Sequence, residues 1–124
     1  MLVRYLQARV KSFGYAFNGL KVLLLTQPHA RLHAIATVVV LIAGKILQLG
    51  QWEWVAILLC IGMVWMAEAL NTALEFLADE VSLEKRDRIG NAKDVAAGGV
   101  LIAAMISITV AGRLRRSGRT RPRS

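Results

Sequence analysis

Three long apolar segments dominate this chain and restrict what it can fold into. They cover about residues 31–49, 52–78 and 91–112, and each is close to the length that an α-helix needs to cross a lipid bilayer. A soluble core built from 124 residues has little room for segments this long, and 56% of the chain is hydrophobic. We therefore predict an all-α membrane protein with three transmembrane helices, forming a single domain over residues 1–112.

The segment before the first span has the pattern of a helix that lies on the membrane surface. Between about residues 3 and 26, apolar side chains repeat on one helical face and polar side chains on the other. The apolar face carries Leu6, Phe13, Phe17, Leu20 and Leu24, and the polar face carries Arg4, Gln7, Lys11 and Asn18. A helix that covers a soluble core would show the same pattern, but no soluble domain remains for it to cover. Pro28 is expected to break the chain direction before the first span.

The basic residues indicate how the spans cross the membrane. Nine of them lie around the start of the first span or between the second and third spans, which the positive-inside rule assigns to the cytoplasm. We therefore expect a multi-pass protein with a cytoplasmic N-terminus. The tail over residues 113–124 carries six arginines on the other side, against the rule, and its composition predicts disorder. The net charge of +8 lies largely in this tail, so we expect no nucleic-acid partner.

The second span contains a stripe of polar side chains. Glu68, Asn71, Thr72, Glu75 and Asp79 fall on one face of a helix, and a carboxylate inside hydrocarbon costs roughly 2.5 kcal/mol or more. Intramembrane acids are therefore candidates for function. Tryptophans at the outer end of the span place Glu68 about one turn inside the membrane, Glu75 at headgroup level and Asp79 in the cytosol.

This stripe and the loop after it suit chemistry between a lipid and a nucleotide. A carboxylate kept from water can act as general base on a lipid hydroxyl, and carboxylates nearer water suit Mg²⁺. Lys93 could neutralise phosphate charge, and Asp94 could hold a metal or orient that lysine. A solvated loop of mixed charge is the alternative for most residues between Asp79 and Asp94.

Other common sites are absent from the sequence. There is no GxxxxGK[ST] phosphate loop and no HRD or DFG sequence of protein kinases. His29 and His33 have the spacing of a metal pair but no third ligand nearby, so packing or hydrogen bonding is the favoured interpretation. Cys60 has no second cysteine in the chain with which to form a disulfide.

Several spaced motifs resemble those of the prokaryotic diacylglycerol kinase and undecaprenol kinase family. They are Glu68-Ala-Leu-Asn71-Thr-Ala-Leu-Glu75, then Asp79, then Asn91-Ala-Lys93-Asp94-Val-Ala-Ala, with upstream matches at Lys11-Ser-Phe-Gly-Tyr15-Ala-Phe-Asn18-Gly19-Leu and Arg31-Leu-His33. The resemblance implies a homotrimer in the bacterial cytoplasmic (inner) membrane. It also implies transfer of the γ-phosphoryl group of Mg-ATP to the hydroxyl of a membrane lipid alcohol, diacylglycerol or undecaprenol.

The resemblance also assigns roles to residues by their positions in the motifs. It implies that Glu68 is the catalytic base, that Asn71 orients it, and that Glu75 holds Mg²⁺. The implied positions of the ATP site are Arg9, Tyr15, Glu75, Asp79, Glu84, Lys85, Arg86, Lys93 and Asp94, and those of the lipid site are Arg31, Glu68 and Ala97.

The sequence departs from the family pattern at two places. Gln27 stands where the family usually has a second metal-binding glutamate, so we expect weaker Mg²⁺ binding or a changed ligand set. Lys85-Arg86 replaces the family's Tyr-His pair, which would alter the nucleotide contacts. Arg31-Leu-His33 is more similar to the undecaprenol kinase branch than to the diacylglycerol branch.

An alternative from another class is a non-catalytic membrane subunit that serves in assembly or transport. In such a protein the polar stripe would stabilise a helix bundle or line an ion path. The glutamine at position 27 gives this alternative some weight, because it removes a charge from the expected metal site.

Overall fold

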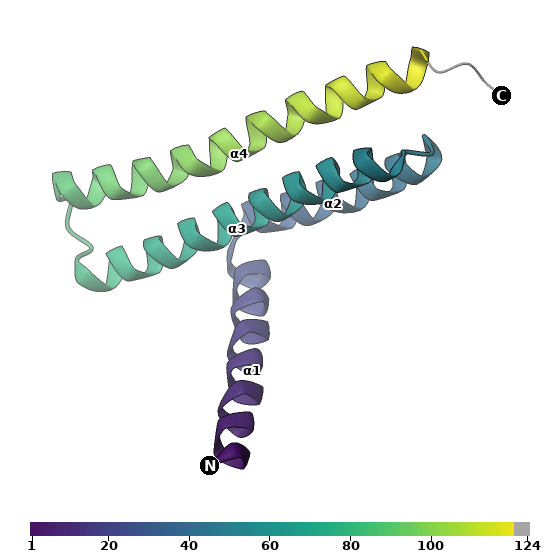
Figure 1. Cartoon of the computed structure of the whole chain (residues 1–124). Helices are drawn as coiled ribbons and strands as arrows, with labels where there is room; N and C mark the ends of the chain where they lie inside the picture. The colour runs from purple at the N-terminus through teal and green to yellow at the C-terminus, as the bar shows by residue number, and fades with distance from the viewer. Residues whose placement is uncertain (121–124) are drawn as a thin grey trace.

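The protein folds into four α-helices (Figure 1). The structure is a computed structural model that describes residues 1–120, with side chains through residue 117. The helices are α1 (Leu2–Thr26), α2 (Pro28–Ile46), α3 (Gln51–Val81) and α4 (Asp87–Thr120). All regular structure among the described residues is helical, as predicted.

Three of the helices could cross a membrane. By length and composition, Pro28–Ile46, Gln51–Val81 and Asp87–Ser117 are each long and apolar enough to do so, which confirms that each predicted span corresponds to a long apolar helix. In Figure 1, α4 runs side by side with α3, and α2 also packs against α3. Most large apolar side chains of these helices point away from the chain's own interior. Apolar side chains on the outer faces of a membrane protein can contact lipid tails or other subunits.

The first helix projects away from the other three (Figure 1). It meets them only near its C-terminal end, where Leu23 is buried, whereas every residue from 1 to 21 is exposed. Gln27 interrupts the helix in an extended conformation, and Pro28 begins α2 at a position where its missing N–H breaks no helical hydrogen bond. The predicted change of chain direction at Pro28 is therefore confirmed.

A tight turn joins α2 to α3 and makes them an antiparallel hairpin. Gln48 adopts a φ of 53°, the left-handed conformation in which helices commonly end, and the N–H of Leu49 donates to the carbonyl of Gly44. Gly44 also lets α3 come close: a Cβ added there would lie 2.9 Å from Cη2 of Trp54 and 3.1 Å from Cδ1 of Leu49. The absence of a side chain at Gly44 is thus part of the packing of this hairpin.

The helix bounds differ from those predicted, most of all at the C-terminal end. The sequence predicts the last helix over residues 91–112, but α4 begins at Asp87 and continues to Thr120. The prediction of a disordered tail is therefore corrected for residues 113–120. Arginine is a good helix former, and the first proline after the span is Pro122, so residues 113–120 contain no proline to end the helix, and their one glycine, Gly118, costs only about 1 kcal/mol. Residues 121–124 lie outside the described part of the chain.

Candidate functional site

The polar stripe of α3 runs from a buried end to an exposed one. Glu68 and Thr72 are only 3% and 4% exposed, although both are polar. Asn71 and Glu75 are half-buried, and Asp79 is exposed near the end of the helix. Because these side chains recur every three or four residues, one helical face carries all of them from the interior toward the α3–α4 loop.

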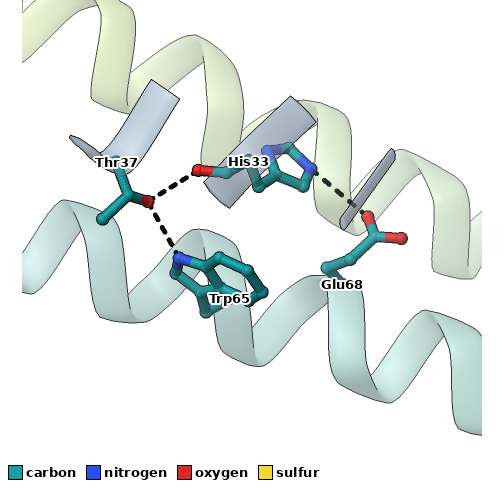
Figure 2. A network of polar contacts seen from close by, with 4 residues as sticks. All are labelled: His33, Thr37, Trp65 and Glu68. Carbon is teal, nitrogen blue, oxygen red and sulfur yellow. Dashed lines mark hydrogen bonds and ion pairs between the residues drawn. The ribbon is translucent and has the colours of Figure 1, made fainter. Parts of the chain in front are cut away.

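The buried carboxylate of Glu68 faces a histidine on the neighbouring helix (Figure 2). Nε2 of His33 lies 3.4 Å from Oε2 of Glu68, and this is the polar contact of Glu68 within the described residues. One turn away, Nε1 of Trp65 donates a hydrogen bond of 2.9 Å to Oγ1 of Thr37. The Thr37 hydroxyl in turn donates to the carbonyl oxygen of His33 at 2.7 Å. Two polar bridges therefore join α2 to α3 at successive turns.

Two buried oxygens beside Glu68 have no hydrogen-bond partner within the described residues. They are Oδ1 of Asn71 and Oγ1 of Thr72. Buried polar atoms in native proteins almost always have a hydrogen-bond partner. Two oxygens without a partner next to a buried carboxylate therefore point to a donor or cation from outside this chain. This part of the stripe can therefore receive a polar group of a ligand.

The loop end of the stripe is linked to α4 by an ion pair. Nζ of Lys93 lies 2.6 Å from Oδ1 of Asp79, and both side chains are partly exposed. The sequence suggests Asp94 as the residue that orients this lysine, but the contact that the structure gives Lys93 is with Asp79. The pair holds the start of α4 against the end of α3 and leaves the two charges close to solvent.

The remaining loop residues expected at a nucleotide site lie near this ion pair in sequence and are exposed. Glu84, Lys85, Arg86 and Asp94 are all on the surface, as is Ala97 one turn further along α4. The backbone N–H of Glu84 donates to Oγ of Ser82, which fixes the first turn of the loop.

Three predicted site residues lie elsewhere or have other partners. Arg31 donates from Nε and Nη2 to the carbonyls of Leu24 and Leu25, at 3.0 and 2.6 Å, so it caps the C-terminal end of α1. The guanidinium of Arg9 stacks on a ring of the same helix, that of Tyr5, at 4.9 Å. Arg9 and Tyr15 both lie on the projecting part of α1, so a single chain does not bring them to Glu68.

The described residues of one chain do not by themselves assemble a metal site. Among the described residues, no cluster of three or more His, Cys, Asp or Glu side chains could hold an ion. The side-chain amide of Gln27 donates to Oγ1 of Thr26 at 3.3 Å, and Glu75 is half-buried on α3. Any cation here would need further oxygens, which Mg²⁺ commonly takes from phosphates and water.

An apolar groove leads away from the polar site. It has a volume of about 260 Å³, begins at His33, and runs between α2, α3 and α4 toward the α2–α3 turn, where Val40, Ile57 and Ala111 line it. Its walls are almost entirely apolar, and Ser107 is the main hydroxyl-bearing exception besides Thr37. A hydrocarbon chain would match these walls.

Sequence reasoning missed the partners of Glu68. It treats His33 through its spacing from His29 and as part of the Arg31-Leu-His33 match, and it does not consider Thr37 and Trp65 as polar residues of the site. A signal was available in the tight link after residue 46. In an antiparallel hairpin, residues at similar distances from the turn lie at similar heights, and His33 and Glu68, 13 residues before Ile46 and 17 residues after Gln51, are within about one helical turn of equal height.

Comparison with known proteins gives a consistent set of similarities. A family described as prokaryotic diacylglycerol kinase matches residues 14–114. Undecaprenol kinase from Bacillus subtilis (strain 168) is 37% identical over 100 residues, which cover 81% of each chain. Diacylglycerol kinase from Synechocystis sp. is 36% identical over 104 residues, 83% of this chain and 59% of that protein. Diacylglycerol kinase from Escherichia coli (strain K12) is 25% identical over 99 residues, 80% of this chain and 81% of its own.

Proposed function

The chain belongs to the prokaryotic diacylglycerol kinase family and is a lipid kinase, a phosphotransferase with an alcohol acceptor, and we propose how its residues perform the reaction. The acceptor is the hydroxyl of diacylglycerol or undecaprenol, and the donor is ATP with Mg²⁺. The observation that carries the proposal is a carboxylate, Glu68, that is 3% exposed within a helix long and apolar enough to span a membrane.

Glu68 is the general base. As the acceptor oxygen bonds to the γ-phosphorus, the bond from that phosphorus to the β–γ bridging oxygen breaks and ADP leaves. The hydroxyl proton passes to the carboxylate of Glu68, which has limited contact with water. Asn71, whose Oδ1 has no hydrogen-bond partner within the described residues, lies one turn along the same face and would orient the base.

Glu75 is the residue that would hold Mg²⁺. The ion would shield the charge of the β- and γ-phosphates during transfer. Glu75 lies seven residues beyond Glu68, and Gln27 lies six residues before His33 on the adjoining segment. The antiparallel contact between His33 and Glu68 therefore supports a placement of Gln27 and Glu75 at about the same height. The Gln27 amide oxygen would supply a neutral ligand.

The nucleotide phosphates would be bound at the loop end of the stripe. Lys93, which pairs with Asp79, supplies a positive charge that can turn to a phosphate oxygen. The exposed loop residues Glu84, Lys85, Arg86 and Asp94 would border the nucleotide, and no phosphate loop is required for that arrangement.

The lipid would approach from the bilayer side. The apolar groove that begins at His33 supports this direction, because it offers hydrocarbon-compatible walls next to the buried base. Ala97 is exposed on α4 and would contact the lipid there. Arg31 in this structure caps α1, so its contribution to lipid binding would be through the placement of α1.

The working enzyme is a homotrimer in the bacterial inner membrane, with its N-terminus in the cytoplasm. Support for an oligomer comes from α1, which carries Arg9 and Tyr15 away from their own chain's Glu68 (Figure 1). These two residues could complete a nucleotide site only on another copy. The apolar face of α1 would lie against the cytoplasmic membrane surface, as its sequence predicts.

The proposal is tested with purified protein in mixed micelles. Labelled phosphate from γ-labelled ATP should appear in a phospholipid product with undecaprenol or diacylglycerol as acceptor. Transfer should stop when Mg²⁺ is removed by a chelator and return when it is restored. A protein that is folded and binds ATP but phosphorylates none of a panel of lipid alcohols would contradict the proposal.

A further inference from the structure

We infer that His33 is a positioning residue for the base Glu68, an inference that rests on the proposed function of that carboxylate. The imidazole fixes one carboxylate oxygen and so directs the other toward the acceptor hydroxyl. His33 belongs to neither the ATP positions nor the lipid positions that the family motifs imply, and the structure supplies its role.

The carboxylate of Glu68 is isolated from water and from most other polar groups of the chain. The residue is 3% exposed and lies in an apolar stretch of α3, so water cannot orient its carboxylate as it would at a surface. Among the described residues, the polar group within reach is Nε2 of His33, 3.4 Å from Oε2. Oε1 is therefore the oxygen left to accept the proton of a bound alcohol.

The imidazole of His33 is itself held in place by residues of α2 and α3. The indole of Trp65 meets the ring of His33 edge to face, with 6.5 Å between ring centres and an interplanar angle of 63°. The indole N–H of Trp65 is fixed by Thr37, whose hydroxyl donates to the backbone carbonyl of His33 (Figure 2). One closed set of contacts therefore determines where Nε2 points.

The position of the Glu68 carboxylate should affect the rate of phosphoryl transfer. The contact of 3.4 Å is long for a hydrogen bond, and such contacts commonly shorten once substrate is bound. A reacting group displaced by about 1 Å can cost roughly 100-fold in rate, even when substrate binding is unchanged. Loss of Nε2 should therefore lower kcat and leave the KM for Mg-ATP unchanged, because the nucleotide positions lie further along the stripe.

The test compares four substitutions by steady-state kinetics in micelles. His33→Gln keeps an amide N–H near the place of Nε2, whereas the amide of His33→Asn is one bond shorter and falls short of Glu68. His33→Leu removes the donor altogether. His29→Leu is the matched control, since His29 is exposed one turn earlier on α2. We expect kcat to fall about 10- to 100-fold in the Asn and Leu variants, to stay within about threefold of wild type in the Gln variant, and to be unchanged in the control.

The comparison of Gln with Asn keeps the test informative if the Leu variant does not fold. Equal kcat values in the Gln and Asn variants, whether both high or both low, would overturn the inference. So would a loss that appears only in the KM for Mg-ATP. The proposed function fails in a different way, through an absence of lipid phosphorylation by the wild-type protein, so the two failures are distinguishable.

Discussion

At the scale of single residues, the site depends on which partner each carboxylate of α3 contacts. A carboxylate in hydrocarbon costs about 2.5 kcal/mol or more, and this cost is tolerated where the group has a partner and a use. Glu68 has His33 as its partner, and Asp79 has Lys93. Glu75 makes no such ion pair within the described residues, which agrees with a role in holding a cation that comes with the substrate.

The substitution Gln27→Glu should strengthen Mg²⁺ binding. A carboxylate at this position adds a negative charge to the proposed Mg²⁺ site, which is worth about 1 kcal/mol or more toward a nearby cation even in water. We expect the Mg²⁺ concentration at half-maximal rate to fall roughly fivefold, measured at saturating ATP and lipid. Gln51→Glu, at the opposite end of α3, is the control and should leave that concentration unchanged. An unaltered requirement in Gln27→Glu would remove Gln27 from the metal site.

At the scale of helices, the sequence predicts well what depends on local pattern. The three apolar segments correspond to α2, α3 and α4, and Pro28 marks the break before α2, because hydrophobicity and the geometry of proline act within a few residues. The end of α4 is predicted poorly. Its arginines match both a disordered tail and a continued helix, and composition cannot distinguish an exposed helix from an exposed coil.

The candidate site likewise has one part that the local pattern predicts and one part that depends on how the helices are aligned. The stripe from Glu68 to Asp79 follows from helical periodicity alone, so the order of residues along one segment is enough to predict it. The contact of Glu68 with His33 depends on how two helices are aligned, and that alignment is set by the turn at Gln48 and by the close approach at Gly44. A shift of one residue along α2 would turn His33 away from α3 by about 100°.

The substitution Gly44→Ala should weaken the α2–α3 hairpin. The new Cβ would lie 2.9 Å from the rigid ring of Trp54, and overpacking of this kind costs about 1 kcal/mol or more, which offsets the helix propensity gained by alanine. We expect a lower thermal unfolding midpoint in detergent. Gly112→Ala, where an added Cβ meets nothing within 4 Å, should keep or raise the midpoint. Equal midpoints for the two variants would contradict a packing role for Gly44.

At the scale of the whole molecule, the described part of the chain buries little of its own apolar surface. Its buried residues are few, large apolar side chains cover the outer faces of α2, α3 and α4, and α1 makes contact only near its end. A bilayer accounts for the outward apolar faces of the spans. It does not account for Arg9 and Tyr15, which under the proposed homotrimer would reach the nucleotide site of another chain.

The central claim is that this membrane protein phosphorylates a lipid alcohol with Glu68 as the base. The most direct test is the rate of phosphoryl transfer from Mg-ATP to undecaprenol or diacylglycerol by wild type, Glu68→Gln and Glu80→Gln, purified to the same oligomeric state. Glu80 is an exposed carboxylate near the end of the same helix and serves as the matched control. We predict a loss of about 1,000-fold or more in Glu68→Gln and a rate within about twofold of wild type in Glu80→Gln. Substantial transfer by Glu68→Gln would contradict the claim.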